Sequence, residues 1–109
     1  MIYGVEVSEQ ADSDLREIFE YIAFELQSPE IASGQLTRLE KQILSLDTMP
    51  ECYQKYEKEP WKSRGLRVLP VDNYVALYIP DSNKKVVTIL RVMYAGRDID
   101  NQLNLHTKQ

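Results

Sequence analysis

The sequence predicts an α+β fold in which an N-terminal strand and two helices precede three more strands, in the order β-α-α-β-β-β. Three observations indicate this order. Apolar residues alternate at the N-terminus, recur every three or four residues between positions 11 and 46, and then form β-rich runs separated by short turns. We therefore expect an antiparallel two-helix hairpin packed on one face of a mainly antiparallel four-stranded sheet.

Residues 3–7 alternate between apolar and other side chains, which predicts a half-buried first strand. The first helix should begin after Ser8, whose hydroxyl can cap the helix N-terminus. Its apolar stripe comprises Ala11, Leu15, Ile18, Phe19, Ile22 and Leu26. The opposite side of this helix, which we expect to face water, carries Asp14, Arg16, Glu17 and Glu20.

The second helix is expected after a break at residues 28–30, with Ser28 as its N-cap and Pro29 at its first position. Its apolar stripe comprises Ala32, Leu36, Leu39, Ile43 and Leu46, and it ends before Pro50. Because the link between the two helices is short, they should form an antiparallel hairpin.

Residues 51–63 mix aromatic and basic side chains between two prolines, so we predict a structured loop there. Three strands should follow, at about 66–71, 74–79 and 85–94. The turns between these strands are too short for parallel crossovers, so the strands should form an antiparallel meander. The first strand can then join the edge of the meander.

Length and composition indicate a single domain spanning residues 1–109, in which residues 99–109 form either a flexible tail or a short helix. With 43% hydrophobic and 28% charged residues, the chain resembles neither a disordered nor a membrane-spanning protein. The N-terminus lacks the features of a signal peptide, which favours the cytoplasm. The single cysteine, Cys52, cannot form an internal disulfide, and this fits a reducing compartment.

The net charge of −4 is unevenly distributed along the chain. Residues 1–50 carry three basic and ten acidic groups, whereas residues 51–109 carry ten basic and seven acidic groups. The basic groups of the second half gather between Lys55 and Arg97. We expect one acidic and one locally basic face, or, in the simpler interpretation, ordinary solvated surface charge.

Three segments resemble the RelE/ParE superfamily of bacterial toxins, and they occur in the same order as in that superfamily. They are Val7–Leu15 followed by Ile18 and Tyr21-Ile22, Asn73–Tyr78, and Ile89–Asp98. The resemblance covers the chain almost from end to end. It implies the toxin component of a type II toxin–antitoxin module, which inhibits bacterial growth and serves in plasmid stabilization. It also implies a small antitoxin partner that is partly disordered alone and folds around the helical hairpin and the sheet.

The superfamily contains two activities, and the resemblance implies different site residues for them. RelE-like members cleave messenger RNA in the ribosomal A site without a metal, whereas ParE-like members poison DNA gyrase. Metal-independent RNA cleavage needs side chains that transfer protons and stabilise an anionic phosphorus centre. The candidate catalytic residues are Arg67, Arg91, Tyr94 and Arg97.

Two departures from the RNA-cleaving pattern favour the gyrase-poisoning activity. Val75 stands where RNA-cleaving relatives usually have an arginine, and a valine can neither bind phosphate nor move a proton. Tyr94 stands where many relatives have a histidine, and a tyrosine pKa of about 10 makes it a poor base but a usable acid. The acidic net charge also fits poorly with the RNA-rich A site. We therefore favour a ParE-like toxin, with RNA cleavage and an inactive antitoxin-binding module as the alternatives.

Most candidate residues also have a purely structural interpretation. Arg67 and Arg91 could project into solvent or pair with an acidic side chain. For Arg91, this acidic side chain would come from the first helix. Arg97 could be an exposed loop charge. Packing is the favoured role of Tyr74 and Tyr78, which share one face of a strand, and of Trp61. Phe24 and Ile31 are either antitoxin contacts or core residues.

Other enzyme classes find little support in the sequence. His106 is the only histidine and lies in a polar tail, so a nucleophilic pair of Cys52 and His106 is not expected. One cysteine and one histidine do not make a metal-ligand cluster, and four glycines leave no phosphate-binding Gly-rich loop. We expect neither a metal nor a cofactor, and no membrane partner.

Overall fold

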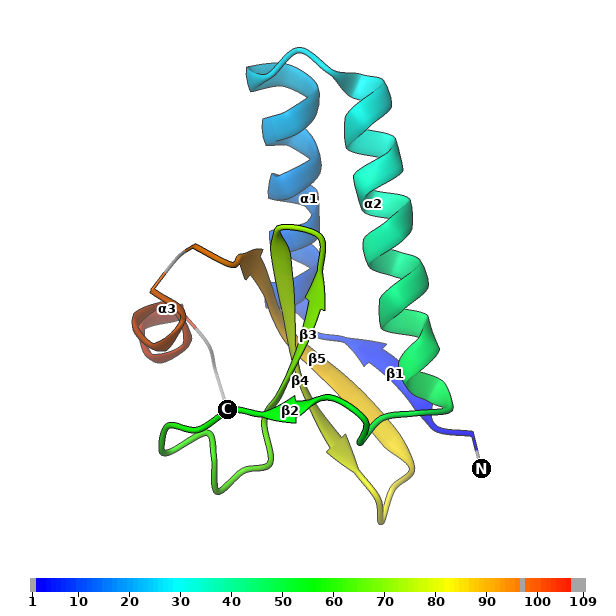
Figure 1. Ribbon diagram of the computed structural model, residues 1–109, viewed down its shortest axis with the longest axis vertical. Coiled ribbons are helices and arrows are strands. Elements are labelled where there is room, and N and C mark those ends of the chain that lie inside the picture. The colour runs from blue at the N-terminus through cyan, green and yellow to red at the C-terminus, as the bar shows by residue number, and fades with distance from the viewer. Residues whose placement is uncertain (1, 97, 107–109) are drawn as a thin grey trace.

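The computed structural model describes residues 2–96 and 98–106, with side chains as far as Leu103. Figure 1 shows a hairpin of two long helices standing against a twisted sheet, with a third helix on the other side of the sheet. The strands are β1 (Gly4–Val7), β2 (Gln54–Lys55), β3 (Arg67–Val71), β4 (Tyr74–Asp81) and β5 (Val86–Tyr94). The helices are α1 (Glu9–Glu20), which continues as the π-helix η1 (Tyr21–Glu25), α2 (Pro29–Leu44), the short 3-10 helix η2 (Ser45–Asp47), and α3 (Ile99–His106).

The sheet has the strand order β1-β5-β4-β3-β2 and is antiparallel except where β1 runs parallel to β5. The predicted antiparallel meander and the position of the first strand at its edge are both confirmed. The sheet has five strands, not four, because Gln54 and Lys55 in the predicted loop pair with β3. A two-residue strand is too short to show the alternation by which strands are recognised in a sequence.

Ser8 joins the start of α1 to the sheet. Its hydroxyl accepts a hydrogen bond from the Ala11 N–H (3.0 Å), which confirms the predicted N-cap. The same hydroxyl donates to the Leu90 carbonyl of β5 (3.0 Å). At the second helix Pro29 occupies the first turn as predicted, but the Ser28 hydroxyl donates to the Leu26 carbonyl and makes no cap bond.

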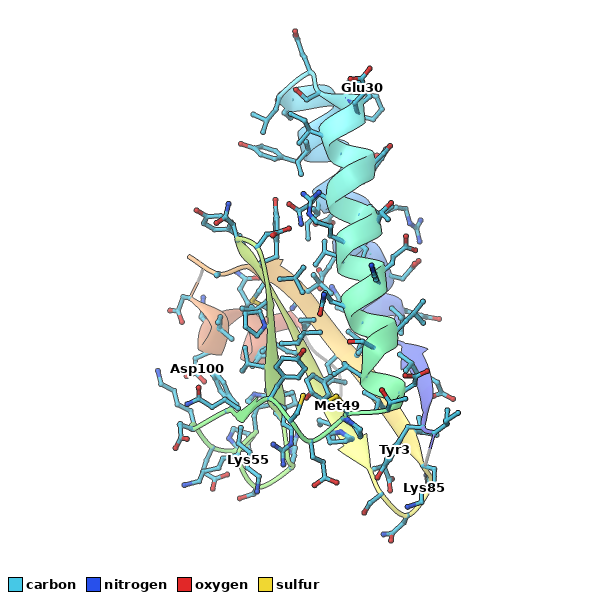
Figure 2. The ribbon with its side chains drawn as sticks, turned by 45° about the vertical axis from the view of Figure 1, so that its right-hand side comes forward. Tyr3, Glu30, Met49, Lys55, Lys85 and Asp100 are labelled. Atoms are coloured by element: carbon cyan, nitrogen blue, oxygen red, sulfur yellow. The ribbon has the colours of Figure 1, made fainter. Side chains whose placement is uncertain are left out.

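The end of the hairpin extends beyond the sheet (Figure 1), and Figure 2 shows Glu30 at this end. Leu26, predicted to face the core, is 55% exposed, so that prediction is wrong. The π-helix η1 changes the angular spacing of side chains in the last turn. This end of the hairpin also extends past the described strands (Figure 1). Phe24 and Ile31 are 69% and 62% exposed, so their interpretation as core residues is also wrong.

Two hydrophobic cores lie on opposite faces of the sheet. The first lies between the sheet and the helical hairpin and contains fully buried Leu39, Leu69 and Tyr78. Tyr78 also donates its hydroxyl to the Pro50 carbonyl, and Tyr74 packs against the same core, so the predicted packing of both tyrosines is confirmed. The second core surrounds Trp61, which is 2% exposed and therefore has the packing role that the sequence favours.

The second core also includes α3, through Ile99 and the fully buried Leu103. Residues 99–106 therefore form the short helix that the sequence allowed, while residues 107–109 lie outside the described residues.

A β-bulge in β5 sets which side chains enter each core. Leu77 pairs with Arg91 and Tyr78 pairs with Ile89, so Leu90 is the extra residue. Strict alternation would place Arg91 with Ile89 in the first core, but after the bulge Val92 takes that place. The bulge thus permits a charged residue in the middle of a mostly apolar strand.

Leu39 and Leu44 form a matched pair on α2, since one is fully buried and the other is 61% exposed. We expect Leu39→Ala to lower the free energy of unfolding by about 2–5 kcal/mol, because it leaves a cavity in the first core. Leu44→Ala should change it by only about 0.5 kcal/mol. Urea unfolding followed by circular dichroism measures both, and equal effects would contradict the assignment of the core.

Tyr56 connects the loop before β3 to α3 by donating its hydroxyl to the Asp100 carboxylate (3.2 Å). Burial, followed by the negative charge of Asp100, raises the pKa of Tyr56 to about 12. A raised folded-state pKa stabilises the protein below the ordinary tyrosine pKa of about 10, and this contribution is lost as the pH rises toward 12. We expect the stability advantage of the wild type over Tyr56→Phe to shrink between pH 10 and 12 in thermal melts. A difference that stays constant over this range would speak against the contact.

Candidate functional site

A groove of about 980 Å³ lies between α1 and the end of β5. It forms because β1 ends at Val7, opposite Ile89, while β5 continues to Tyr94. Along this last part of β5, helix α1 takes the place of a neighbouring strand. The groove is lined by Gln10, Asp14, Glu17, Ile18, Tyr21, Leu26, Tyr74, Arg91, Val92, Met93, Tyr94 and Gln102.

Arg91 forms a buried ion pair with Asp14 at the base of the groove. The side chains are only 6% and 8% exposed. The guanidinium Nε donates to Asp14 Oδ2 (2.7 Å) and Nη2 donates to Oδ1 (3.0 Å), so the pair is bidentate. Nη1 donates to the Gln102 carbonyl of α3 (3.1 Å). The Arg91 charge is therefore compensated inside the protein.

The prediction that Asp14 faces water is wrong. Its carboxylate lies against the outer edge of β5, where Oδ2 also accepts a hydrogen bond from the Val92 N–H (3.0 Å). A carboxylate beside an apolar helical stripe is normally solvated, but here a guanidinium and an edge N–H replace water. The interpretation in which Arg91 pairs with an acid from the first helix is the one that the geometry bears out.

Three tyrosines from three different elements line the same groove. The rings of Tyr74 and Tyr94 are 6.0 Å apart and nearly perpendicular, at 79°. Tyr94 is 52% and Tyr21 is 56% exposed, whereas Tyr74 is partly buried. Burial raises the pKa of Tyr74, and the neighbouring phenols of Tyr21 and Tyr94 raise it further. Tyr74 is therefore uncharged at neutral pH.

The structure brings only two of the predicted site residues together. Arg91 and Tyr94 line the groove, whereas Arg67 lies across the sheet on β3. The Arg67 Nη1 donates to the carbonyls of Glu51 (3.2 Å) and Tyr53 (2.7 Å), and Nη2 is 3.9 Å from the Glu51 carboxylate. Arg97 lies outside the described residues. The catalytic roles of these four residues remain predictions.

Sequence reasoning missed several groove residues, among them Gln10, Glu17, Tyr21 and Gln102. Glu17 near the end of α1 and Tyr21 at the start of η1 are four residues apart, a spacing that places both on one side of a helix. That spacing was available from the sequence. The pairing of Tyr74 with Tyr94 was not, because it depends on the register of β4 and β5.

The lining of the groove is aromatic and slightly acidic. Among its described residues, Asp14 and Glu17 are acidic and Arg91 is basic. In the described part of the chain, no group of three or more His, Cys, Asp or Glu side chains is arranged to hold a metal ion. None of the helices described here is long and apolar enough to cross a membrane.

Removing Asp14 should destabilise the protein strongly. We expect Asp14→Ala to cost about 3–5 kcal/mol in urea unfolding, because it leaves the Arg91 charge buried without its partner. Asp12→Ala is the control, since Asp12 pairs with Arg16 on the exposed surface and should cost at most about 1 kcal/mol. The double variant Asp14→Leu with Arg91→Met should recover most of the lost stability. Similar small losses for both single variants would refute the importance of the buried pair.

Comparison with known proteins identifies the family. The family model for the ParE toxin of the parDE type II toxin–antitoxin system matches residues 5–99. Among curated protein sequences, none matches the chain significantly. A chain of the chromosomal ParDE system from P. aeruginosa has 20% identity and a TM-score of 0.71, over 85% of this chain and 96% of that chain.

Two further solved structures share the fold at similar identity. A double mutant of the E. coli toxin RelE in the free state has 18% identity and a TM-score of 0.65, over 94% of this chain and 93% of that chain. A chain of the RelBE2 toxin–antitoxin complex from Mycobacterium tuberculosis has 22% identity and a TM-score of 0.62, over 86% of this chain and 99% of that chain. At these identities the structures show a common fold, whereas the family model covers most of the chain. The chain therefore belongs to the ParE toxin family of type II toxin–antitoxin systems.

Proposed function

We propose that this toxin arrests bacterial growth by poisoning DNA gyrase and not by cleaving messenger RNA. The observation that carries the proposal is the compensation of the Arg91 charge by Asp14. A phosphate group entering the groove would have to compete with the Asp14 carboxylate for this guanidinium, at the cost of a buried bidentate pair. Among the described lining residues the net charge is negative, which opposes phosphate binding and favours a protein target.

Two positions outside the groove support the same conclusion. Val75, where RNA-cleaving relatives usually have an arginine, is buried in the second core and contributes only to packing. Arg67 donates to two backbone carbonyls beside Glu51, so part of its hydrogen-bonding capacity is already used. Both observations argue against a phosphate-binding site on the sheet.

RNA cleavage is the second candidate function, and the position of Tyr94 is the observation in its favour. Its ring is half exposed at the end of the groove, three residues from Arg91 on the same strand. A tyrosine hydroxyl there could donate a proton to a leaving oxygen. An inactive module that only binds an antitoxin is the third candidate.

We also propose that a cognate antitoxin covers the end of the helical hairpin. Phe24, Leu26 and Ile31 are more than half exposed there, which is costly for a protein that remains alone in water. An antitoxin segment that folds on contact could cover these side chains. Solved structures that share the fold include toxin–antitoxin complexes from M. tuberculosis and E. coli.

With gyrase as its target, the toxin would act in the cytoplasm.

Controlled expression in E. coli tests the target. We expect growth arrest with gyrase trapped on DNA, detected as DNA breaks and as covalent gyrase–DNA complexes, without cleavage of messenger RNA at ribosomes. Codon-phased RNA cuts would instead assign the RelE-like activity. If the protein is expressed and growth does not stop, the inactive antitoxin-binding module is the function that is left.

The variant Tyr94→Phe removes only the hydroxyl oxygen of Tyr94, and it therefore distinguishes gyrase poisoning from RNA cleavage. For a gyrase poison the aromatic ring should suffice, so we expect toxicity to be retained. If Tyr94 is the general acid of an RNA-cleaving site, loss of its hydroxyl should reduce activity by about 10²–10⁴-fold. Arg97→Ala, assayed in parallel, reports whether the basic residue after β5 is needed for either activity.

A further inference from the structure

We propose that Tyr21, Tyr74, Tyr94 and Glu17 form a binding site for one arginine side chain of gyrase. The proposal rests on the proposed function in taking gyrase as the protein that enters the groove between α1 and β5. It adds the chemistry of the contact, which is a guanidinium held by aromatic rings and one carboxylate. We call these four residues the tyrosine site.

All three tyrosine rings belong to the lining of one groove. Tyr21 comes from η1, Tyr74 from the start of β4 and Tyr94 from the end of β5, and all three line the same cavity. The rings of Tyr74 and Tyr94 meet edge to face, with centroids 6.0 Å apart and ring planes at 79°. Aromatic ring faces carry negative partial charge, so the exposed rings of Tyr21 and Tyr94 can attract a cation.

Glu17 supplies a full negative charge beside these rings. It lines the groove four residues before Tyr21, and its side chain is exposed. The ion pairs found among the described residues do not include Glu17. Asp14, by contrast, is already bonded to Arg91. Glu17 is therefore the carboxylate in this groove that can accept a cation from another molecule.

The shape of the site favours arginine over lysine. A guanidinium is planar, so it can stack on one ring while its N–H groups form a bidentate pair with a carboxylate. Arg91 and Asp14 show this pairing within the same groove. A lysine ammonium forms no such planar stack, and an anion would be repelled by Glu17. Because Tyr21 and Tyr94 are more than half exposed, a side chain from another protein can reach the site.

N-acetyl-arginine amide tests the site directly by titration into the purified toxin, followed by NMR of ¹³C-labelled tyrosine rings. We expect shifts of the Tyr21, Tyr74 and Tyr94 resonances with a dissociation constant on the order of 1–10 mM, as suits a fragment of this size. N-acetyl-citrulline amide has nearly the same shape without the charge and should bind at least about fivefold more weakly. Equal binding of the two probes, or shifts confined to other tyrosines, would overturn the proposal.

Four substitutions at three exposed positions separate the contributions of Glu17 and of the Tyr94 ring to binding of the arginine probe. Glu17→Gln should weaken binding of the arginine probe about threefold or more, whereas Glu20→Gln, which lies outside the groove, should leave it unchanged. Tyr94→Leu should weaken binding by a similar factor, and Tyr94→Phe should restore it because the ring is kept. If Tyr94→Phe binds as poorly as Tyr94→Leu, the hydroxyl carries the contact and the proposed stacking is wrong.

A supercoiling assay with purified E. coli DNA gyrase then tests the source of the arginine. We expect Glu17→Gln to raise the toxin concentration needed for inhibition at least about threefold, with Glu20→Gln matching the wild type. Inhibition that is insensitive to Glu17→Gln would overturn gyrase as the source of the arginine. If the wild-type toxin does not inhibit gyrase at all while the arginine probe still binds, the proposed function fails and the tyrosine site stands as a receptor for another protein.

Discussion

The buried pair between Asp14 and Arg91 connects three parts of the fold that are distant in sequence. It joins α1 to β5 directly and reaches α3 through the Gln102 carbonyl. Burying two charges costs several kcal/mol per ion, which only good geometry and further hydrogen bonds can offset. Here the pair is bidentate, and the Val92 N–H satisfies the carboxylate further. This contact therefore helps to hold α1 against the sheet edge, together with the hydrogen bond from Ser8 to β5.

The same pair determines the character of the groove. Because Asp14 compensates the charge of Arg91, the groove offers a partner mainly the tyrosine rings and the Glu17 carboxylate. Such a surface suits a cationic and partly apolar protein segment far better than the phosphate backbone of a nucleic acid. Because a fold does not by itself determine an activity, the proposal of gyrase poisoning is argued from the side chains that line the groove.

Small irregularities of the backbone produce this arrangement. Because β1 ends at Val7, the outer edge of β5 is open to α1 beyond Ile89. The bulge at Leu90 moves Arg91 out of the first core and lets Val92 fill it. The π-helix η1 extends the first helix beyond Glu20, and its first residue, Tyr21, lines the groove. Each feature is local, yet together they build one site from residues of four elements.

The sequence by itself determined the order of the elements, the N-cap at Ser8 and the meander of β3 to β5, because these depend on local periodicity, turns and capping. Together with the resemblance of three segments, it also indicated the family. Only the tertiary structure decided that Asp14 is buried, that Leu26 is exposed and that Arg67 lies apart from Tyr94. Asp14 and Arg91 are separated by 77 residues, and no local pattern encodes a contact at that distance. Whether a polar side chain is solvated depends on what the rest of the chain brings to it, and that is decided when the elements pack.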